Sequence, residues 1–422
     1  MRIKRVLALS AALTALAVGA PAYTAFSADG EGDCKNVSNG ASESDPQCFW
    51  MVTDSQEALD IVRYWAENDG ANMVAATPDQ RGFIDCTVEE CSKDGEGDGS
   101  LPPDGAVDES GLTPTCANGQ PGCAVPPQAE VDAAARTPAG QAVAAAAAGD
   151  MRVWIDTELL DEYQAGGQTF TDAVRRTAAL AAQPGVVGIR FSTQLGWNGA
   201  VKTAEDMKRF VTDTSAALRV AAPGKKLAVH TVLPGFGCGT SDLCAAEMAK
   251  KYPLLTADNV EPLLTSGAVD QLALDSGLLG TGYATWKISA EQAARNQWAK
   301  VKALAWDTLA QISAEDAGMA GKDASPLSAD QAAAAAKERV VAPLKDGAAT
   351  VNLWSGWKDA SGATYRIMGA KLAATPAWDQ LAKLQPLQRR LTTLYNPATP
   401  EVGVGEDLKK LSEVFGQVYI SE

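Results

Sequence analysis

The sequence predicts a (β/α)8 barrel with some irregular strands, preceded by a small acidic region that carries disulfides. After residue 150, short apolar runs alternate with longer amphipathic stretches, and connections of this length join parallel strands. Within each run, one alternate set of side chains is apolar and the other is small, aromatic or polar, which fits a strand between outer helices and a barrel lumen. A doubly wound sheet is the alternative, but both of its faces would be apolar.

Residues 1–27 are predicted to be a secretory signal peptide. Basic residues at positions 2–5 precede an apolar run, and small residues at 20–22 and 25–27 suit a signal peptidase. The run is shorter than the roughly 20 residues that cross a bilayer, and no later segment is apolar enough to do so. We therefore expect a secreted, extracellular protein with no transmembrane segment after cleavage; an uncleaved anchor is the alternative.

The chain is strongly acidic, with 52 aspartates and glutamates against 36 lysines and arginines and a net charge of −16. Loss of the three basic residues of the signal peptide would change −16 to −19. Such a surface repels nucleic acid and anionic membranes. We expect no nucleic-acid partner, and instead neutral or cationic partners or bound cations.

Residues 28–127 form the acidic N-terminal region, which is rich in Gly, Pro and Ser. One amphipathic helix is predicted at 55–68, between short strands at 49–52 and 72–74. Six of the eight cysteines lie here, and the even count with a single histidine favours disulfides over a zinc site. The pairing stays open among Cys34, Cys48, Cys86, Cys91, Cys116 and Cys123.

Two runs of alternating acids and glycines, at 29–33 and 94–99, have the pattern of the first half of a calcium-binding loop. An EF-hand needs an acid at the twelfth position, where Gly105 stands, so an EF-hand is excluded. We expect no cofactor; an irregular calcium site is the alternative to a solvated acidic loop.

Residues 128–150 are Ala-rich and end near Gly149, which predicts a helix or a linker at the domain boundary. The barrel domain comprises residues 151–422. Its five clear strands are predicted at 152–157, 186–192, 226–232, 269–275 and 350–354. The remaining three are expected within 315–348, near 391–395 or in the N-terminal region.

Three helices of this domain have recognisable starting signals, a hydroxyl at the cap and an acid or amide three residues later. These caps are Thr203, Ser289 and Ser328. Apolar residues from Trp298 to Ile312 are spaced as one helical face, which predicts a helix through this stretch.

Active sites of parallel barrels lie at the carboxyl ends of the strands. Those ends and the loops after them carry carboxylates, a guanidinium, the only imidazole and several aromatic rings. The predicted catalytic acids are Asp156, Glu158 and Asp275. The predicted substrate-binding residues are Arg190, Gln194, Trp197, Asn198, His230, Phe236, Tyr283, Trp354 and Trp357. No metal site is predicted, because one histidine cannot build a typical zinc site.

This combination suits the hydrolysis of glycosidic bonds, which needs one protonated carboxyl and one carboxylate. Arg190 would hold Asp156 ionised, while a drier Asp275 would keep its proton. The alternative is that Arg190 forms a structural ion pair with Asp156 or Glu158. His230 has no nucleophile motif beside it, so it either orients substrate or is an ordinary core histidine.

The loop after the third predicted strand carries Cys238 and Cys244, six residues apart among glycines. A disulfide between them would stiffen a loop at the barrel mouth. The glycine spacing does not match that of a phosphate-binding loop, which excludes this kind of site.

About residues 150–400 resemble the TIM-barrel glycoside hydrolases that actinobacteria secrete. The residues that carry the resemblance are Trp154-Ile-Asp-Thr-Glu158, His230, Leu274-Asp275 and Leu353-Trp354-Ser-Gly-Trp357. The resemblance implies a carbohydrate substrate and an aromatic sugar platform on the last predicted strand. The chain departs from the family because it lacks the DxxDxDxE run of chitinase-like barrels, and because Asp275 rather than a glutamate ends the fourth strand.

The first hypothesis is a secreted carbohydrate-active enzyme that hydrolyses glycosidic bonds with Asp275 and either Asp156 or Glu158. The second is a non-catalytic secreted protein that binds a glycan or another cell-envelope component at the barrel mouth. The third is a structural envelope protein whose acidic N-terminal region makes the contact. The expected partner in the first two is a glycan or cell-wall polysaccharide.

Overall fold

The computed structural model describes residues 25–28, 34–35, 48–52, 72–76, 125–197, 199–275, 282–358 and 362–422. The chain divides into two compact units, Met1–Asp104 and Gly105–Glu422. The strands of the first unit are β1 (Ala25–Ala28), β2 (Cys34–Lys35), β3 (Cys48–Val52) and β4 (Asn72–Ala76). They form one sheet in the order β2-β1-β3-β4, in which β3 and β4 are parallel. The predicted strands at 49–52 and 72–74 fall within β3 and β4.

Several predictions for the N-terminal region lie outside the described residues. They are the helix at 55–68, the two runs of acids and glycines, the pairing of the six cysteines, and most of the signal peptide. Within the described part of the chain, the search for a helix long and apolar enough to cross a membrane finds none.

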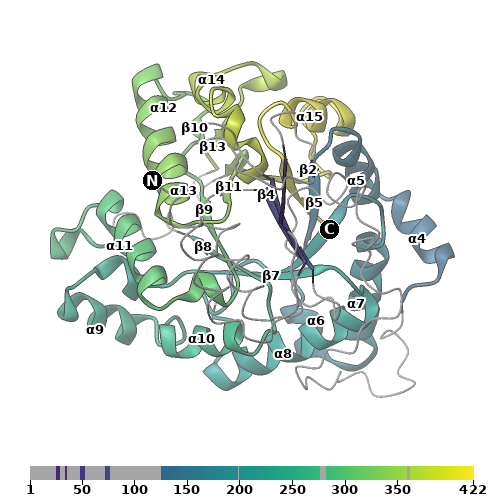
Figure 1. Cartoon of the computed structure of the whole chain (residues 1–422), viewed down its shortest axis with the longest axis horizontal. Coiled ribbons are helices and arrows are strands. Elements are labelled where there is room, and N and C mark those ends of the chain that lie inside the picture. Colours follow the sequence, from purple (N-terminus) through teal and green to yellow (C-terminus); the bar gives the residue numbers. More distant parts are fainter. Residues whose placement is uncertain are drawn as a thin grey trace. The chain divides into compact units, whose positions relative to one another are not determined.

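The second unit contains a closed barrel of eight parallel strands (Figure 1). In chain order they are β5 (Arg152–Asp156), β6 (Val186–Ser192), β7 (Lys226–Thr231), β8 (Gln271–Asp275), β9 (Gln311–Asp316), β11 (Val351–Leu353), β14 (Leu391–Tyr395) and β15 (Gln417–Ser421). Each strand pairs with the next of these eight in sequence, and β15 pairs with β5 to close the ring. The predicted (β/α)8 fold is confirmed.

Helices surround the barrel (Figure 1). They are α4 (Gln128–Ala135), α5 (Pro138–Ala148), α6 (Leu160–Ala165), α7 (Gly167–Ala181), α8 (Ala204–Ala221), α9 (Asp242–Lys251), α10 (Ala257–Thr265), α11 (Ala290–Ala303), α12 (Ala329–Ala336), α13 (Ala342–Asp346), α14 (Pro376–Ala382) and α15 (Val404–Leu411). Thr203, Ser289 and Ser328 cap α8, α11 and α12 as predicted, and Ser328 completes a capping box with Gln331.

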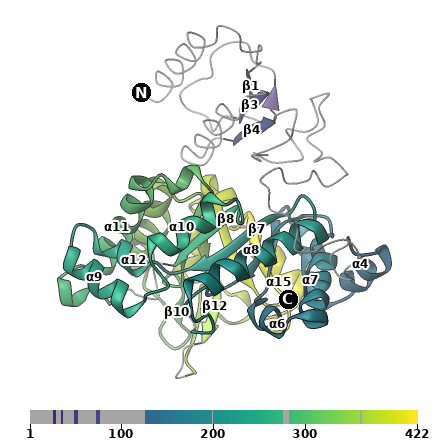
Figure 2. The ribbon, with the colours of Figure 1, turned by 90° about the horizontal axis from the view of Figure 1, so that it is seen from below.

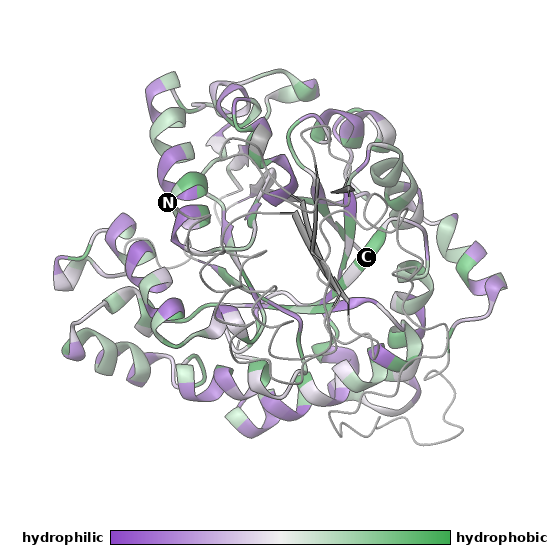
Figure 3. Ribbon diagram, in the orientation of Figure 1, coloured by the Kyte–Doolittle hydropathy of each residue, from purple (hydrophilic) through white to green (hydrophobic). Residues whose placement is uncertain are grey.

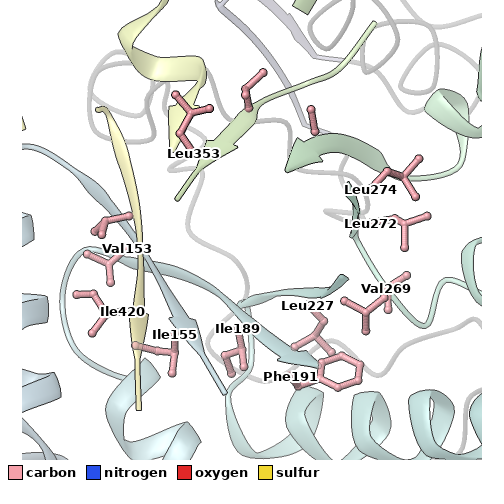
Figure 4. Close-up of a cluster of buried hydrophobic side chains, with 14 of the residues drawn as sticks. Val153, Ile155, Ile189, Phe191, Leu227, Val269, Leu272, Leu274, Leu353 and Ile420 are labelled. Atoms are coloured by element: carbon pink, nitrogen blue, oxygen red, sulfur yellow. The ribbon is translucent and has the colours of Figure 1, made fainter. Parts of the chain in front are cut away.

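The strands separate an apolar outer layer from a polar lumen. Ile155, Ile189, Leu227 and Leu274 are fully buried on the outer side of the strands, toward the helices (Figure 4). The helices alternate hydrophobic and hydrophilic segments along their length (Figure 3). The side chains between these outer ones, such as Arg190, face inward because successive residues of a strand point to opposite faces. The fold therefore collects the polar strand residues in the lumen.

One predicted helix is wrong in its second half, because the helical face does not continue to Ile312. The helix α11 ends at Ala303, and Ala305 has a left-handed backbone with φ of 53°. Ile312 lies in β9, where it alternates with polar Ser313 in the two-residue period of a strand. The apolar residues on either side of this turn match helical spacing only by coincidence.

A small antiparallel sheet lies beyond the carboxyl ends of β9 and β11. Its strands are β10 (Gly321–Lys322), β12 (Gly356–Lys358) and β13 (Thr364–Arg366), in the order β10-β13-β12. Figure 2 shows β10 and β12 at the same end of the barrel as the carboxyl terminus. This sheet therefore adds side chains to the mouth where the predicted site lies.

Candidate functional site

Arg190 forms the centre of a charged cluster in the barrel. Its Nε and Nη2 donate to Asp156 Oδ1 and Oδ2 at 2.6 and 2.9 Å, and its Nη1 donates to Glu315 Oε2 at 2.6 Å. All three side chains are buried, and none is more than 9% exposed. Burial alone would lower the pKa of Arg190, but the charges of Asp156 and Glu315 outweigh burial and raise this pKa. Arg190 is therefore a permanent positive charge held by two acids.

Three strands bring this cluster together. Asp156 and Arg190 are register partners on β5 and β6, and Glu315 reaches in from β9. Tyr419 of β15 supports the guanidinium, whose Cζ lies 4.2 Å from the ring centroid. The hydroxyl of Tyr419 accepts a hydrogen bond from Gln271 Nε2 at 2.6 Å. A cation against an aromatic face is favourable, particularly away from water.

Glu315 remains ionised although it is 1% exposed. Burial would raise the pKa of this carboxyl, but Arg190, His230 and a hydrogen bond from Trp354 together lower it. Trp354 Nε1 donates to Glu315 Oε1 at 2.7 Å. Glu315 therefore places a negative charge beside His230 in the lumen.

His230 and Asp275 form a buried pair at the ends of β7 and β8. Nδ1 of His230 contacts the carbonyl oxygen of Thr193, and Nε2 lies 3.5 Å from Asp275 Oδ2. Burial would lower the pKa of His230, but the charges of Glu315 and Asp275 outweigh it and raise this pKa. The imidazole is thus favoured in its protonated form.

Glu158 binds the loop that follows β6. Its Oε2 accepts hydrogen bonds from Ser192 Oγ at 3.2 Å and from the backbone N–H and hydroxyl of Thr193 at 2.8 and 3.2 Å. Its Oε1 accepts one from the backbone N–H of Leu160 at 3.3 Å. Burial raises the pKa of Glu158 despite these bonds. The carboxylate holds Thr193, which in turn holds His230.

Aromatic rings continue from the lumen onto the small sheet. Trp354 meets Trp357 edge to face, with ring centroids 6.3 Å apart. Trp357 stacks on Tyr365 of β13, with centroids 4.1 Å apart and planes 4° apart. Lys322 Nζ lies 5.4 Å from the Tyr365 ring centroid. The two predicted tryptophans therefore belong to one continuous aromatic surface at the barrel mouth.

Other predicted binding residues pack away from the charged cluster. Phe236 is buried against Trp306, with ring centroids 5.1 Å apart. Trp197 stacks on Tyr252, with centroids 5.0 Å apart. Tyr283 is buried, and its hydroxyl donates to the carbonyl oxygen of Pro234 at 2.8 Å.

Two predicted residues lie in the loop after β6. The backbone carbonyl of Gln194 accepts a hydrogen bond from the backbone N–H of Trp197 at 3.0 Å, and the Gln194 side chain is half-buried. Asn198 lies outside the described residues. The predicted disulfide between Cys238 and Cys244 is present and staples the start of α9 to the preceding turn at Pro234–Cys238.

Glu315, Asn352 and Tyr419 are site residues that the sequence analysis did not select. Glu315 could have been found from the sequence of β9, because apolar Ile312 and Ala314 alternate there with polar Ser313 and Glu315, as in the other strands. In the described part of the chain, no group of three or more His, Cys, Asp and Glu side chains is arranged to hold a metal ion.

No protein-family model matches this chain, and no curated protein matches it. Similar solved structures include a protein assigned as a phosphonomutase from Burkholderia cenocepacia J2315, with 13% identity, a TM-score of 0.33, and coverage of 65% of this chain and 87% of that one. Hydroxymethylglutaryl-CoA lyase from Pseudomonas aeruginosa has 14% identity, a TM-score of 0.38 and coverage of 65% and 76%. A 2,3-dimethylmalate lyase of the PEP mutase/isocitrate lyase superfamily has 13% identity, a TM-score of 0.34 and coverage of 67% and 80%.

The prediction of a glycoside hydrolase or a glycan-binding protein is wrong. The similar structures are named as a mutase and two lyases, and none of these three is named as a glycoside hydrolase. The site gives a physical reason, because Arg190 occupies both oxygens of Asp156 and the Thr193 loop occupies Glu158.

Proposed function

We propose that the protein is an enzyme that transfers a proton to or from a small substrate at the barrel mouth, with His230 as the proton-carrying group and Asp275 as its partner. The observation that carries this proposal is the orientation of the imidazole. A carbonyl oxygen only accepts hydrogen bonds, so the Thr193 contact requires the hydrogen on Nδ1 of His230. Nε2 is then the atom that exchanges a proton.

In a neutral His230 with this tautomer, the lone pair of Nε2 would face the carboxylate of Asp275 at 3.5 Å. Two acceptors that face each other are unfavourable unless a proton lies between them. Protonation of Nε2 removes the conflict, in agreement with the raised pKa of His230. A proton held at this atom can pass to a substrate, and the imidazole can recover it from solvent.

Arg190 acts in this proposal through Glu315. It keeps Glu315 ionised, and the charge of Glu315 is the largest of those that favour protonated His230. The acids Asp156, Glu315 and Asp275 outnumber the bases Arg190 and His230 in the site. This excess of acidic side chains favours a neutral or cationic substrate over an anion.

His230 is the single histidine of the chain, so its titration can be followed without ambiguity. Nitrogen NMR of the full chain labelled with 15N-histidine should show the Nδ1–H tautomer and a pKa above the ordinary 6.5. Asp275→Asn should lower that pKa, whereas Asp330→Asn, at an exposed position of α12, should leave it unchanged. An Nε2–H tautomer, or a pKa at or below the ordinary value, would refute the proposal.

Proton transfer itself can be measured by hydrogen exchange. The neutral form of His230, which becomes populated as the pH rises, can take a proton at Nε2 from the carbon next to a carbonyl group, exchange it with D2O and return a deuteron to that carbon. The full chain in D2O should therefore introduce deuterium there in at least one compound of a panel of small neutral and cationic carbonyl compounds. His230→Gln should abolish this exchange because the glutamine amide acts neither as an acid nor as a base near neutral pH. Exchange that survives His230→Gln would assign the proton transfer to another group.

A further inference from the structure

Asn352 is a buried amide in the lumen of the barrel. It lies on β11 between Val351 and Leu353, both of which belong to the apolar layer beneath the helices, so Asn352 faces inward. It is 1% exposed, and neither Oδ1 nor Nδ2 has a hydrogen-bond partner of regular geometry among the described residues. Buried amides are nearly always satisfied, because an unmade hydrogen bond destabilises the folded state. The described residues therefore leave hydrogen-bonding capacity of this amide unused.

The surroundings of Asn352 belong to the candidate site. Its register partner on β9 is Glu315, and Trp354 follows two residues later on the same face. The amide of Asn352 faces Glu315 as a donor and helps to lower the pKa of that carboxyl, although its geometry falls short of a regular hydrogen bond. Glu315 also supplies the largest charge effect on His230. Asn352 and His230 thus flank the same carboxylate.

We infer that Asn352 determines substrate specificity by binding a neutral carboxamide or ureido group, an inference that rests on the proposed function of this site. An asparagine side chain offers an acceptor and a donor in one plane. A group with a carbonyl oxygen beside an N–H satisfies both at once. The same carbonyl oxygen is a suitable acceptor for the proton that His230 holds.

Groups of similar size and different charge fit less well. A carboxylate would satisfy only Nδ2, and Glu315, Asp156 and Asp275 would repel it. An ammonium group would satisfy only Oδ1. Leaving one half of a buried amide unpaired, or bringing a second anion beside Glu315, opposes binding. Acetamide and acetate therefore form a matched pair of probes for this site.

The test measures probe binding and thermal stability together. Acetamide should shift the indole N–H NMR signal of Trp354, which donates to Glu315, and acetate should not. Asn352→Leu should weaken acetamide binding by about tenfold or more, because the paired donor and acceptor are lost. The Tm of the same variant reports separately how much the amide contributes to stability through Glu315, so the loss of acetamide binding is the deciding result. Asn352→Ala repeats the test without added volume.

Asn259→Leu is the matched control. The amide of Asn259 donates to the carbonyl oxygen of Pro253 at 2.9 Å and lies on α10, outside the lumen. The same substitution there should lower the Tm and leave acetamide binding unchanged. A lower Tm with unchanged acetamide binding in Asn352→Leu would overturn the inference and make Asn352 structural. Equal binding of acetate and acetamide would overturn it as well.

The two proposals can fail separately. If His230 has a raised pKa and the Nδ1–H tautomer but the protein does not bind acetamide, the inference about Asn352 is wrong and the proton-transfer proposal stands. Acetamide binding that depends on Asn352, with an ordinary pKa of His230, would retain the binding site and remove the proton-transfer proposal.

Discussion

Glu158 and His230 are connected through a single residue, Thr193. The backbone N–H and hydroxyl of Thr193 donate to Glu158, and its carbonyl oxygen holds Nδ1 of His230. The carboxylate that was predicted to be catalytic is therefore connected to the imidazole through Thr193. It fixes the loop that sets the orientation of the ring.

Replacing Glu158 should therefore change His230. Glu158→Ala removes the acceptor of several hydrogen bonds, which should cost about 1–3 kcal/mol of unfolding free energy. It should also reduce the population of the Nδ1–H tautomer, as seen by nitrogen NMR. Asp161→Ala, an exposed acid on α6, is the control and should change neither quantity. An unchanged tautomer in Glu158→Ala would show that Thr193 holds its position without the carboxylate.

Removal of Arg190 should strongly destabilise the barrel. Arg190→Met leaves Asp156 and Glu315 buried without their cation, and losing one partner of a buried ion pair costs about 3–5 kcal/mol. Urea unfolding measures this loss. Arg209→Met, which removes an exposed pair with Asp206 on α8, should change the unfolding free energy far less than Arg190→Met does. Equal losses in the two variants would contradict the central role of Arg190.

Protonated His230 should make stability depend on pH. Its pKa is raised in the folded state, so its contribution is fully present below the ordinary value of 6.5 and is lost as the pH rises through the folded pKa. The stability of the wild type relative to His230→Gln should therefore decrease as the pH rises above the ordinary histidine value of 6.5. Denaturant unfolding at several pH values checks this. A difference that grows with pH would mean that the folded state favours neutral histidine.

The disulfide should stabilise the turn before α9 without acting on the site. Replacing Cys238 and Cys244 by serine opens a short loop, which should cost about 2 kcal/mol. The pKa of His230 should stay unchanged, because none of the groups that set it lies on this segment. Thermal unfolding and the histidine titration test the two statements. A shifted histidine pKa would link the disulfide to the charged cluster.

Much of the barrel could be predicted because the apolar residues of its outer face alternate along each strand, a pattern that is visible in the local sequence. The strand 186–192 matches β6 residue for residue, and four other strands match within two residues at each end. The strands β9 and β15 were missed for different reasons. The apolar residues of β9 fit a false helical spacing, whereas β15 has a readable alternation, with apolar Val418 and Ile420 between polar or aromatic neighbours, that was not selected. The strand β14 lies near 391–395, one of the regions in which a remaining strand was expected.

The site was less predictable because it depends on ring closure. An ion pair of Arg190 with an acid on the preceding strand was one of two alternatives, and the structure contains the pair with Asp156. The contact of Arg190 with Glu315 joins strands three places apart in the ring, and no local pattern encodes it. The pKa values of His230 and Glu315 depend on burial and on charges from other strands. Both conditions arise only once the barrel has closed, so the local sequence does not reveal them.

The pairing of β15 with β5 also has a kinetic consequence. The hydrogen bond between Trp154 and Gln417 across this seam spans 263 residues. Until the seam forms, the domain is an open sheet with two unpaired edges, and such edges invite association with other chains. Contacts between residues so far apart also slow folding. Folding of this domain should therefore finish at the β5–β15 seam, and variants that weaken the seam should accumulate as open, aggregation-prone intermediates rather than as unfolded chains.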